Sequence, residues 1–240
     1  MQLIDAPSPN FDARTAPPDM VVLHYTGMPT CDEALARLRD PEAKVSAHYL
    51  IDENGRAFAL VPEGRRAWHA GVSYWRGERN LNGVSIGVEL VNPGHEFGYR
   101  PYPDDQIATL IELLADIRSR WTIPDARILG HSDVAPGRKE DPGERFPWAA
   151  LAAAGHGLWL EPRAAPGAPL ALGAEGPGVL ALRAGLARLG YACRPSGLYD
   201  GETQTVVTAF QRHWVQSRID GAADGVTRAR LIALLRLARP

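Results

Sequence analysis

The chain has 240 residues, 45% of them hydrophobic and 22% charged, so it can bury a real core and is not disordered throughout. At about 100–200 residues per domain, this length fits one large domain, or a large domain and a small one. A net charge of −2 gives a nucleic-acid partner no general electrostatic support, two cysteines exclude a disulfide framework, and no apolar run approaches the ~18 residues of a membrane span.

The first part of the chain alternates short apolar runs with one long amphipathic pattern. The dipeptide Asn54-Gly55 favours a tight turn between two strands. The apolar spacing of Ile107, Leu110, Ile111, Leu114 and Ile117 predicts a helix. The other expected elements are a helix at Cys31–Arg39 and strands at Met20–Thr26, Ser46–Asp52, Arg56–Val61, Val84–Val91 and Arg127–Gly130. This order predicts an α/β (α+β) fold, a mixed β-sheet flanked by helices.

The composition changes near residue 155. Residues 159–177 are rich in Pro, Gly and Ala without a periodic apolar face, which is typical of a linker. Beyond it, apolar stripes predict three short helices, the second entered at Thr203 and the third at Thr227. We therefore expect a domain at 1–158, a linker at 159–177 and a small three-helix domain at 178–240.

Two histidines stand at the ends of expected strands, His24 and His131. Strand ends hold side chains in a fixed geometry beside an opening, which suits metal ligands. The Pro- and Gly-containing loop after His131 can return a carboxylate to it, either Asp141 or the nearer Asp133. Two histidines and a carboxylate with one open position are the ligand set of zinc hydrolases. The alternative is that these residues are separately hydrogen-bonded and unrelated.

Glu89 lies on the strand face that also carries Ser85 and Gly87, whose small side chains leave space. A carboxylate buried on a sheet is costly unless it is paired or functional. One interpretation is an ion pair with an arginine. The other is a general base next to a metal-activated water.

Five motifs in order resemble the zinc-dependent N-acetylmuramoyl-L-alanine amidases of the amidase-2 type, over residues 18–150. They are Val22-Leu-His24, Val45-Ser-Ala-His-Tyr-Leu-Ile51, Ala67-Trp-His-Ala-Gly71, Ser85-Ile-Gly-Val-Glu-Leu90 and Gly130-His-Ser-Asp-Val-Ala-Pro-Gly-Arg-Lys-Glu-Asp-Pro-Gly143. The resemblance implies that Zn²⁺ is bound by His24, His131 and Asp141, in preference to Asp133. It also implies that Glu89 is the catalytic acid/base and that Lys139 stabilises the oxyanion. All five residues precede the linker, so we expect a chain ending near residue 160 to fold and cleave small muramyl peptides.

Three further residues of these motifs are candidates for the substrate groove: His48, His69 and Trp68. His48 could instead be a core histidine. Trp68 and Trp75 could offer faces for sugar stacking, although aromatic residues more often belong to the core.

Residues 178–240 resemble a small helical peptidoglycan-binding domain. The resemblance is carried by Leu186–Tyr191, Gly197–Thr203, Ala209–Arg212 and Gly225–Thr227. Contact with polymeric peptidoglycan through this domain is therefore expected, and a purely structural docking role is the alternative.

The implied reaction is hydrolysis of the amide between N-acetylmuramic acid, or its 1,6-anhydro form, and the L-alanine of the stem peptide. Because residues 1–19 contain no secretory signal pattern, we expect a cytoplasmic enzyme that recycles muropeptides or anhydro-muropeptides. The alternatives are a periplasmic lytic amidase and a non-catalytic peptidoglycan-recognition protein. A structural zinc site is a weaker alternative, because such sites have four protein ligands.

Overall fold

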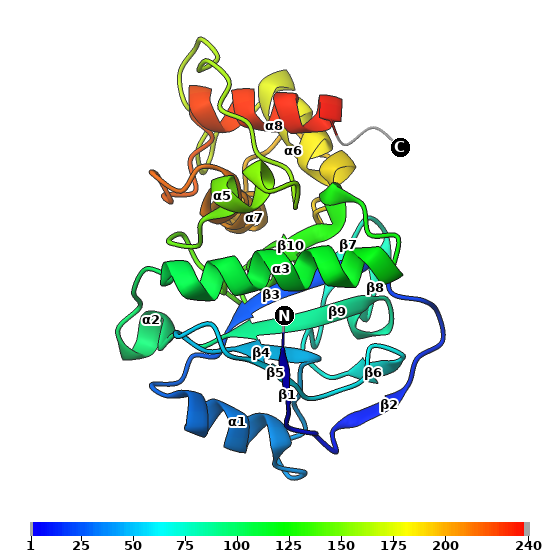
Figure 1. Cartoon of the computed structure of the whole chain (residues 1–240). Helices are drawn as coiled ribbons and strands as arrows, with labels where there is room; N and C mark the ends of the chain where they lie inside the picture. The colour runs from blue at the N-terminus through cyan, green and yellow to red at the C-terminus, as the bar shows by residue number, and fades with distance from the viewer. Residues whose placement is uncertain (1, 238–240) are drawn as a thin grey trace.

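The computed structural model describes residues 2–237 and confirms a mixed sheet flanked by helices (Figure 1). Six strands form the main sheet in the order β1-β5-β4-β9-β3-β10. Strands β10, β3, β9 and β4 run parallel to one another, whereas β5 runs antiparallel to β4 and parallel to β1. The strands of this sheet are β1 (Leu3–Asp5), β3 (Met20–Tyr25), β4 (Tyr49–Ile51), β5 (Ala57–Ala59), β9 (Ser85–Leu90) and β10 (Ile128–Gly130).

Four further strands, which the sequence analysis did not predict, form two small two-stranded sheets. They are β2 (Phe11–Ala13), β6 (Arg65–Ala67), β7 (Tyr74–Trp75) and β8 (Glu78–Arg79). The expected hairpin is confirmed as β4 and β5, although both strands are shorter than predicted. Gly55 in its turn has a φ of 77°, a conformation that favours glycine.

The helices of the first part are α1 (Cys31–Arg39), α2 (Gly94–Phe97), α3 (Asp104–Arg120), α4 (His131–Val134) and α5 (Trp148–Ala153), with single 3₁₀ turns at Leu81–Gly83 and Asp125–Arg127. The C-terminal helices are α6 (Pro177–Leu189), α7 (Gly201–Trp214) and α8 (Gly225–Leu237). The last two begin two residues before the expected threonines. Asp200 and Asp224 accept hydrogen bonds from the backbone of Thr203 and Thr227, and so satisfy the free N–H groups of each first turn.

The two faces of the sheet have different partners. Alternate residues of the central strands, such as Val21, Leu23 and Val88, pack with the apolar side of α3, which lies across one face (Figure 1). On the opposite face, Met20 and Val22 pack toward the C-terminal helices. At the other end of that face, Leu50 and neighbouring residues pack against α1. The polar residues of β3 and β9 lie between these two apolar clusters.

The C-terminal helices share a core with the sheet. One cluster joins Met20, Val22, Leu129 and Val134 to residues of all three helices. Trp75 is 1% exposed, and its ring centroid lies 5.0 Å from that of Tyr191. A chain ending near residue 160 would expose this surface. The structure therefore argues against the expectation that residues 1–158 fold alone.

Among the described residues, no helix is both long enough and apolar enough to span a membrane.

Candidate functional site

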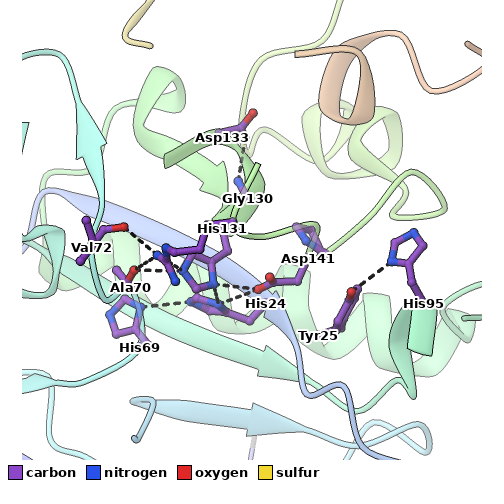
Figure 2. A network of polar contacts seen from close by, with 12 residues as sticks. His24, Tyr25, His69, Ala70, Val72, His95, Gly130, His131, Asp133 and Asp141 are labelled. Atoms are coloured by element: carbon purple, nitrogen blue, oxygen red, sulfur yellow. Dashed lines mark hydrogen bonds and ion pairs between the residues drawn. The ribbon is translucent and has the colours of Figure 1, made fainter. Parts of the chain in front are cut away.

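Three buried side chains converge on the sheet face opposite α3: His24, His131 and Asp141 (Figure 2). Nδ1 of His24 lies 3.0 Å from Nδ1 of His131, and the two nitrogens lie 2.9 and 3.0 Å from Oδ2 of Asp141. His24 belongs to β3, and His131 is the first residue of α4, directly after the neighbouring strand β10. The sequence analysis placed both histidines at strand ends, and the structure brings them together.

The geometry of these three atoms fits a small metal ion. With Zn–N and Zn–O bonds of about 2.0–2.2 Å, ligand atoms of a tetrahedral site lie about 3.3–3.6 Å apart, slightly farther than the 2.9–3.0 Å between these three atoms. Two imidazole nitrogens and one carboxylate oxygen are a donor set suited to zinc. Burial, followed by the nearby His131, lowers the pKa of His24 to about 4, so His24 is neutral at pH 7. Burial alone would raise the pKa of Asp141, but the two histidines hold it well below its usual range.

The loop 135–143 returns Asp141 to His131 through backbone contacts. Ser132 N donates to the carbonyl of Asp141 over 2.9 Å. The hydroxyls of Tyr99 and Tyr102 both donate to the carbonyl of Pro142, at 2.8 and 2.6 Å. The turn of the chain is thus fixed on both sides of the carboxylate.

Asp133, the rival carboxylate, faces the other way. It accepts hydrogen bonds from Gly130 N at 2.8 Å, the Tyr191 hydroxyl at 2.6 Å and His213 Nδ1 at 2.6 Å. Two of these partners belong to the C-terminal region. Asp133 therefore joins α4 to the C-terminal helices and does not approach the cluster of His24, His131 and Asp141.

Glu89 is the register partner of His24 on the adjacent strand β9. Its Oε2 atom is buried and has no hydrogen-bond partner among the described residues. Burial, followed by the negative charge of Asp141, raises the pKa of Glu89 well above its usual range. No arginine forms an ion pair with Glu89 within residues 2–237, so the structure does not support that interpretation.

A cavity of about 290 Å³ is lined by all five residues to which the resemblance assigns a role in metal binding or catalysis. Its lining includes Trp68 and His69, two of the three groove candidates, together with His24, Glu89, His131, Lys139 and Asp141. An adjoining cavity of about 430 Å³ shares Lys139 and Trp68 with it and adds the cationic side chains of Lys44, Arg66 and Arg138. The space next to the three converging donors is therefore lined by polar and charged side chains, including the carboxylate of Asp12.

His48 and Trp75 do not reach this cavity. His48 is fully buried, its Nδ1 accepts from Gly87 N at 2.9 Å, and its Nε2 lies 3.1 Å from the carbonyl of Arg65. It is the core histidine of the alternative interpretation. Trp75 has no exposed face for a sugar, because it packs against Gly190 and Tyr191.

From the sequence we expected open space over Gly87, next to Glu89. In the structure this space is filled. The imidazole of His69 lies directly over this glycine, where an added Cβ would approach its Cγ to 2.5 Å. Nδ1 of His69 lies 3.1 Å from Nε2 of His24. Sequence reasoning missed this contact because the two residues are 45 positions apart and no spacing rule joins them.

Comparison with known proteins agrees with this geometry. Residues 14–144 match the N-acetylmuramoyl-L-alanine amidase family, and residues 175–231 match the peptidoglycan binding domain family. The N-acetylmuramoyl-L-alanine amidase AmiD of Escherichia coli is 39% identical over 236 residues, which cover 90% of this chain and 82% of AmiD. The 1,6-anhydro-N-acetylmuramyl-L-alanine amidase AmpD of Haemophilus influenzae is 37% identical over 161 residues, covering 59% of this chain and 85% of AmpD.

Solved structures give the same result. The structure of E. coli AmiD with anhydro-N-acetylmuramic acid-L-Ala-D-γ-Glu-L-Lys has a TM-score of 0.80 at 37% identity and covers 95% of this chain and 93% of AmiD. That of Pseudomonas aeruginosa AmpDh3 with an anhydromuramic pentapeptide has a TM-score of 0.77 at 30% identity and covers both chains completely. The chain belongs to the N-acetylmuramoyl-L-alanine amidase family.

Proposed function

We propose that this protein hydrolyses the amide between 1,6-anhydro-N-acetylmuramic acid, or N-acetylmuramic acid, and the L-alanine of the stem peptide, in peptidoglycan recycling. The observation that carries the proposal is a single cavity lined by His24, His131 and Asp141 together with Glu89 and Lys139. The names of the relatives AmiD and AmpD, and the anhydromuropeptides bound in two related structures, support this substrate class.

In this proposal, His24 Nδ1, His131 Nδ1 and Asp141 Oδ2 hold a zinc ion. When bound, zinc polarises a carbonyl and lowers the pKa of a water molecule toward about 7. Two imidazoles and one carboxylate would leave a bound zinc ion with a net positive charge. A structural zinc site does not fit, because it would have a fourth protein ligand.

Glu89 acts as the acid/base. Its Oε2 has no hydrogen-bond partner among the described residues, and burial, followed by the negative charge of Asp141, raises its pKa well above the usual range. Glu89 takes a proton from the attacking water and returns it to the leaving amine of L-alanine. The Lys139 ammonium, which lines the same cavity, donates to the oxygen that becomes negatively charged.

The division into a catalytic domain at 1–158, a linker at 159–177 and a helical domain at 178–240 also belongs to the proposal, with binding of peptidoglycan by the last part. The match of residues 175–231 to a peptidoglycan binding domain supports this binding. It equally favours the second candidate function, a periplasmic amidase that acts on polymeric peptidoglycan.

The decisive experiment incubates the full chain with anhydro-N-acetylmuramic acid-L-Ala-D-γ-Glu-L-Lys and follows the products by mass spectrometry, with metal content measured in parallel. We expect one zinc per chain, release of free tripeptide and loss of turnover after chelation. Zinc should restore the turnover. Binding of the muropeptide without cleavage by the zinc-loaded protein would instead indicate a recognition protein, and full turnover by a metal-free chain would contradict the zinc site.

The cytoplasm is the proposed compartment. Cell fractionation and the ratio of turnover on anhydro-muropeptides to turnover on intact sacculi test it together. Recovery in the cytoplasm with the small substrate preferred would support recycling. Recovery in the periplasm with sacculi preferred would support the lytic alternative.

A further inference from the structure

A chain of hydrogen bonds leads from a backbone carbonyl to His24. The Ser85 hydroxyl donates to the carbonyl of Leu81 over 2.6 Å, and its Oγ lies 3.2 Å from Nε2 of His69. Nδ1 of His69 then lies 3.1 Å from Nε2 of His24. Ser85 is fully buried, and His24 and His69 are 1% and 9% exposed.

The positions of the protons in this chain follow from its first member. A carbonyl oxygen only accepts, so the single hydroxyl proton of Ser85 must point to Leu81. Ser85 Oγ is then an acceptor, and His69 Nε2 must carry the proton that it receives. In a neutral imidazole this leaves Nδ1 of His69 as an acceptor, so Nε2 of His24 carries a proton and Nδ1 of His24 has the free lone pair.

We propose that His69 is a positioning residue that fixes the tautomer and ring orientation of His24, so that Nδ1 of His24 faces His131 and Asp141 as a ready metal ligand. This inference rests on the metal site of the proposed function. It assigns to His69 a role different from substrate contact, although His69 also lines the cavity.

Ala70, the residue after His69, orients the ring of His131 in the same way. Nε2 of His131 donates to the carbonyl of Ala70 over 3.0 Å, which leaves Nδ1 of His131 free (Figure 2). The backbone of both supporting residues is held by one side chain, because Asn82 Oδ1 accepts from His69 N at 3.1 Å and Ala70 N at 2.7 Å. Two consecutive residues thus orient both imidazole ligands, one through its ring and the other through its carbonyl.

Gly87 explains why the His69 ring can occupy this position. An added Cβ at residue 87 would come within 2.5–2.7 Å of three ring atoms of His69. Since the ring is confined between this backbone and His24, a side chain at position 87 would displace it from His24.

The test measures zinc affinity by competition with a chromophoric chelator, without substrate, on the full chain. Partners that orient a metal-ligating histidine typically affect metal affinity 10–100-fold. We expect His69→Leu to weaken zinc binding by about this factor and Gly87→Ala to weaken it as well. His69→Gln, which keeps one acceptor and one donor, should recover part of the loss. The absorption spectrum of the Co²⁺-loaded protein should change with His69→Leu.

The matched control is His156→Gln, a substitution of a buried histidine bonded to Arg118, away from the ligands. It should leave zinc affinity unchanged. Wild-type zinc affinity and Co²⁺ spectrum in folded His69→Leu would overturn the proposal. If that variant does not fold, wild-type values in both Gly87→Ala and Ser85→Ala would overturn it. A wild-type protein that binds zinc but does not cleave muropeptides would contradict the proposed function and leave the role of His69 intact.

Discussion

Arg183 of the C-terminal helices and the cluster of His24, His131 and Asp141 on the sheet are all buried, but their polar atoms are satisfied differently. In the helices, Arg183 is 2% exposed and donates to two backbone carbonyls and the Thr203 hydroxyl, while it pairs with Asp200 and Glu202. Its bonds close within the region and hold α6 to the start of α7.

On the sheet, the corresponding groups do not satisfy one another. His24, His131 and Asp141 bring lone pairs together, and an oxygen of Glu89 has no partner among the described residues. Buried polar groups normally find hydrogen-bond partners in the protein or in ordered water. Arg183 thus stabilises the fold, whereas the sheet cluster leaves donor atoms that could bind a metal ion.

The largest expected effect tests whether the two regions can be separated. A chain ending at residue 160 should be insoluble or unfolded, because it exposes Met20, Val22, Leu129 and Val134 and leaves Asp133 without Tyr191 and His213. Solubility and circular dichroism measure this outcome.

Co-expression of residues 1–160 with residues 161–240 is the control for that truncation. The two fragments should assemble and restore solubility, since the shared core does not require a continuous linker. A soluble and active fragment 1–160 would contradict this and restore the expectation of an independent catalytic domain.

Glu89→Gln should lower kcat by about 10²–10⁴-fold, the range of a positioned acid/base, while zinc content and thermal stability are kept. Its matched control is Glu63→Gln, a carboxylate away from the cavity that is fully bonded to Tyr49, Arg120 and Trp121. The control should lose about 1–3 kcal/mol of stability and keep its kcat. Near wild-type kcat in Glu89→Gln would mean that another residue is the base.

Lys139→Ala should lower kcat by about 10²–10³-fold, as is usual when one oxyanion donor is removed. Lys139→Arg should recover only part of this rate, because a planar guanidinium does not place its donors as a compact ammonium does. Steady-state kinetics, with zinc content measured as a control, distinguishes the loss of the positive charge from the change in donor geometry. Wild-type kcat in Lys139→Arg would show that positive charge alone is needed.

The smallest effect concerns His48, a histidine that contributes to the fold without contacting the cavity. Burial lowers the pKa of His48 to about 3, so the folded protein does not bind its proton between pH 6.5 and 3, whereas the unfolded chain does. Stability therefore falls as pH decreases through this window, by up to about 1.4 kcal/mol per pH unit from this residue. The stability difference between wild type and His48→Gln, from urea unfolding, should narrow from pH 7 to 5. A stability difference that stays constant from pH 7 to 5 would contradict the lowered pKa of His48 in the folded protein.

The sequence predicted the helices and strands that have a clear apolar period. It also predicted the site residues that stand at the ends of these elements. Strand β3, helix α1 and helix α3 lie where their apolar patterns placed them, and His24 and His131 follow from strand ends. Residue patterns alone could not choose between Asp133 and Asp141, because that choice depends on the path of loop 135–143. The contact of His69 with Gly87 and the burial of Trp75 under Tyr191 depend on packing between distant segments, which no local pattern encodes.

The four residues of α4 face two ways, with His131 toward the cavity and Asp133 toward the C-terminal helices. Because α4 has only four residues, His131 and Asp133 cannot move far independently of each other. Detachment of the C-terminal helices by heat or denaturant should therefore release the metal in the same cooperative step. Zinc release and loss of helical signal would then share one midpoint, and the chain would melt as a single unit in spite of its two family matches.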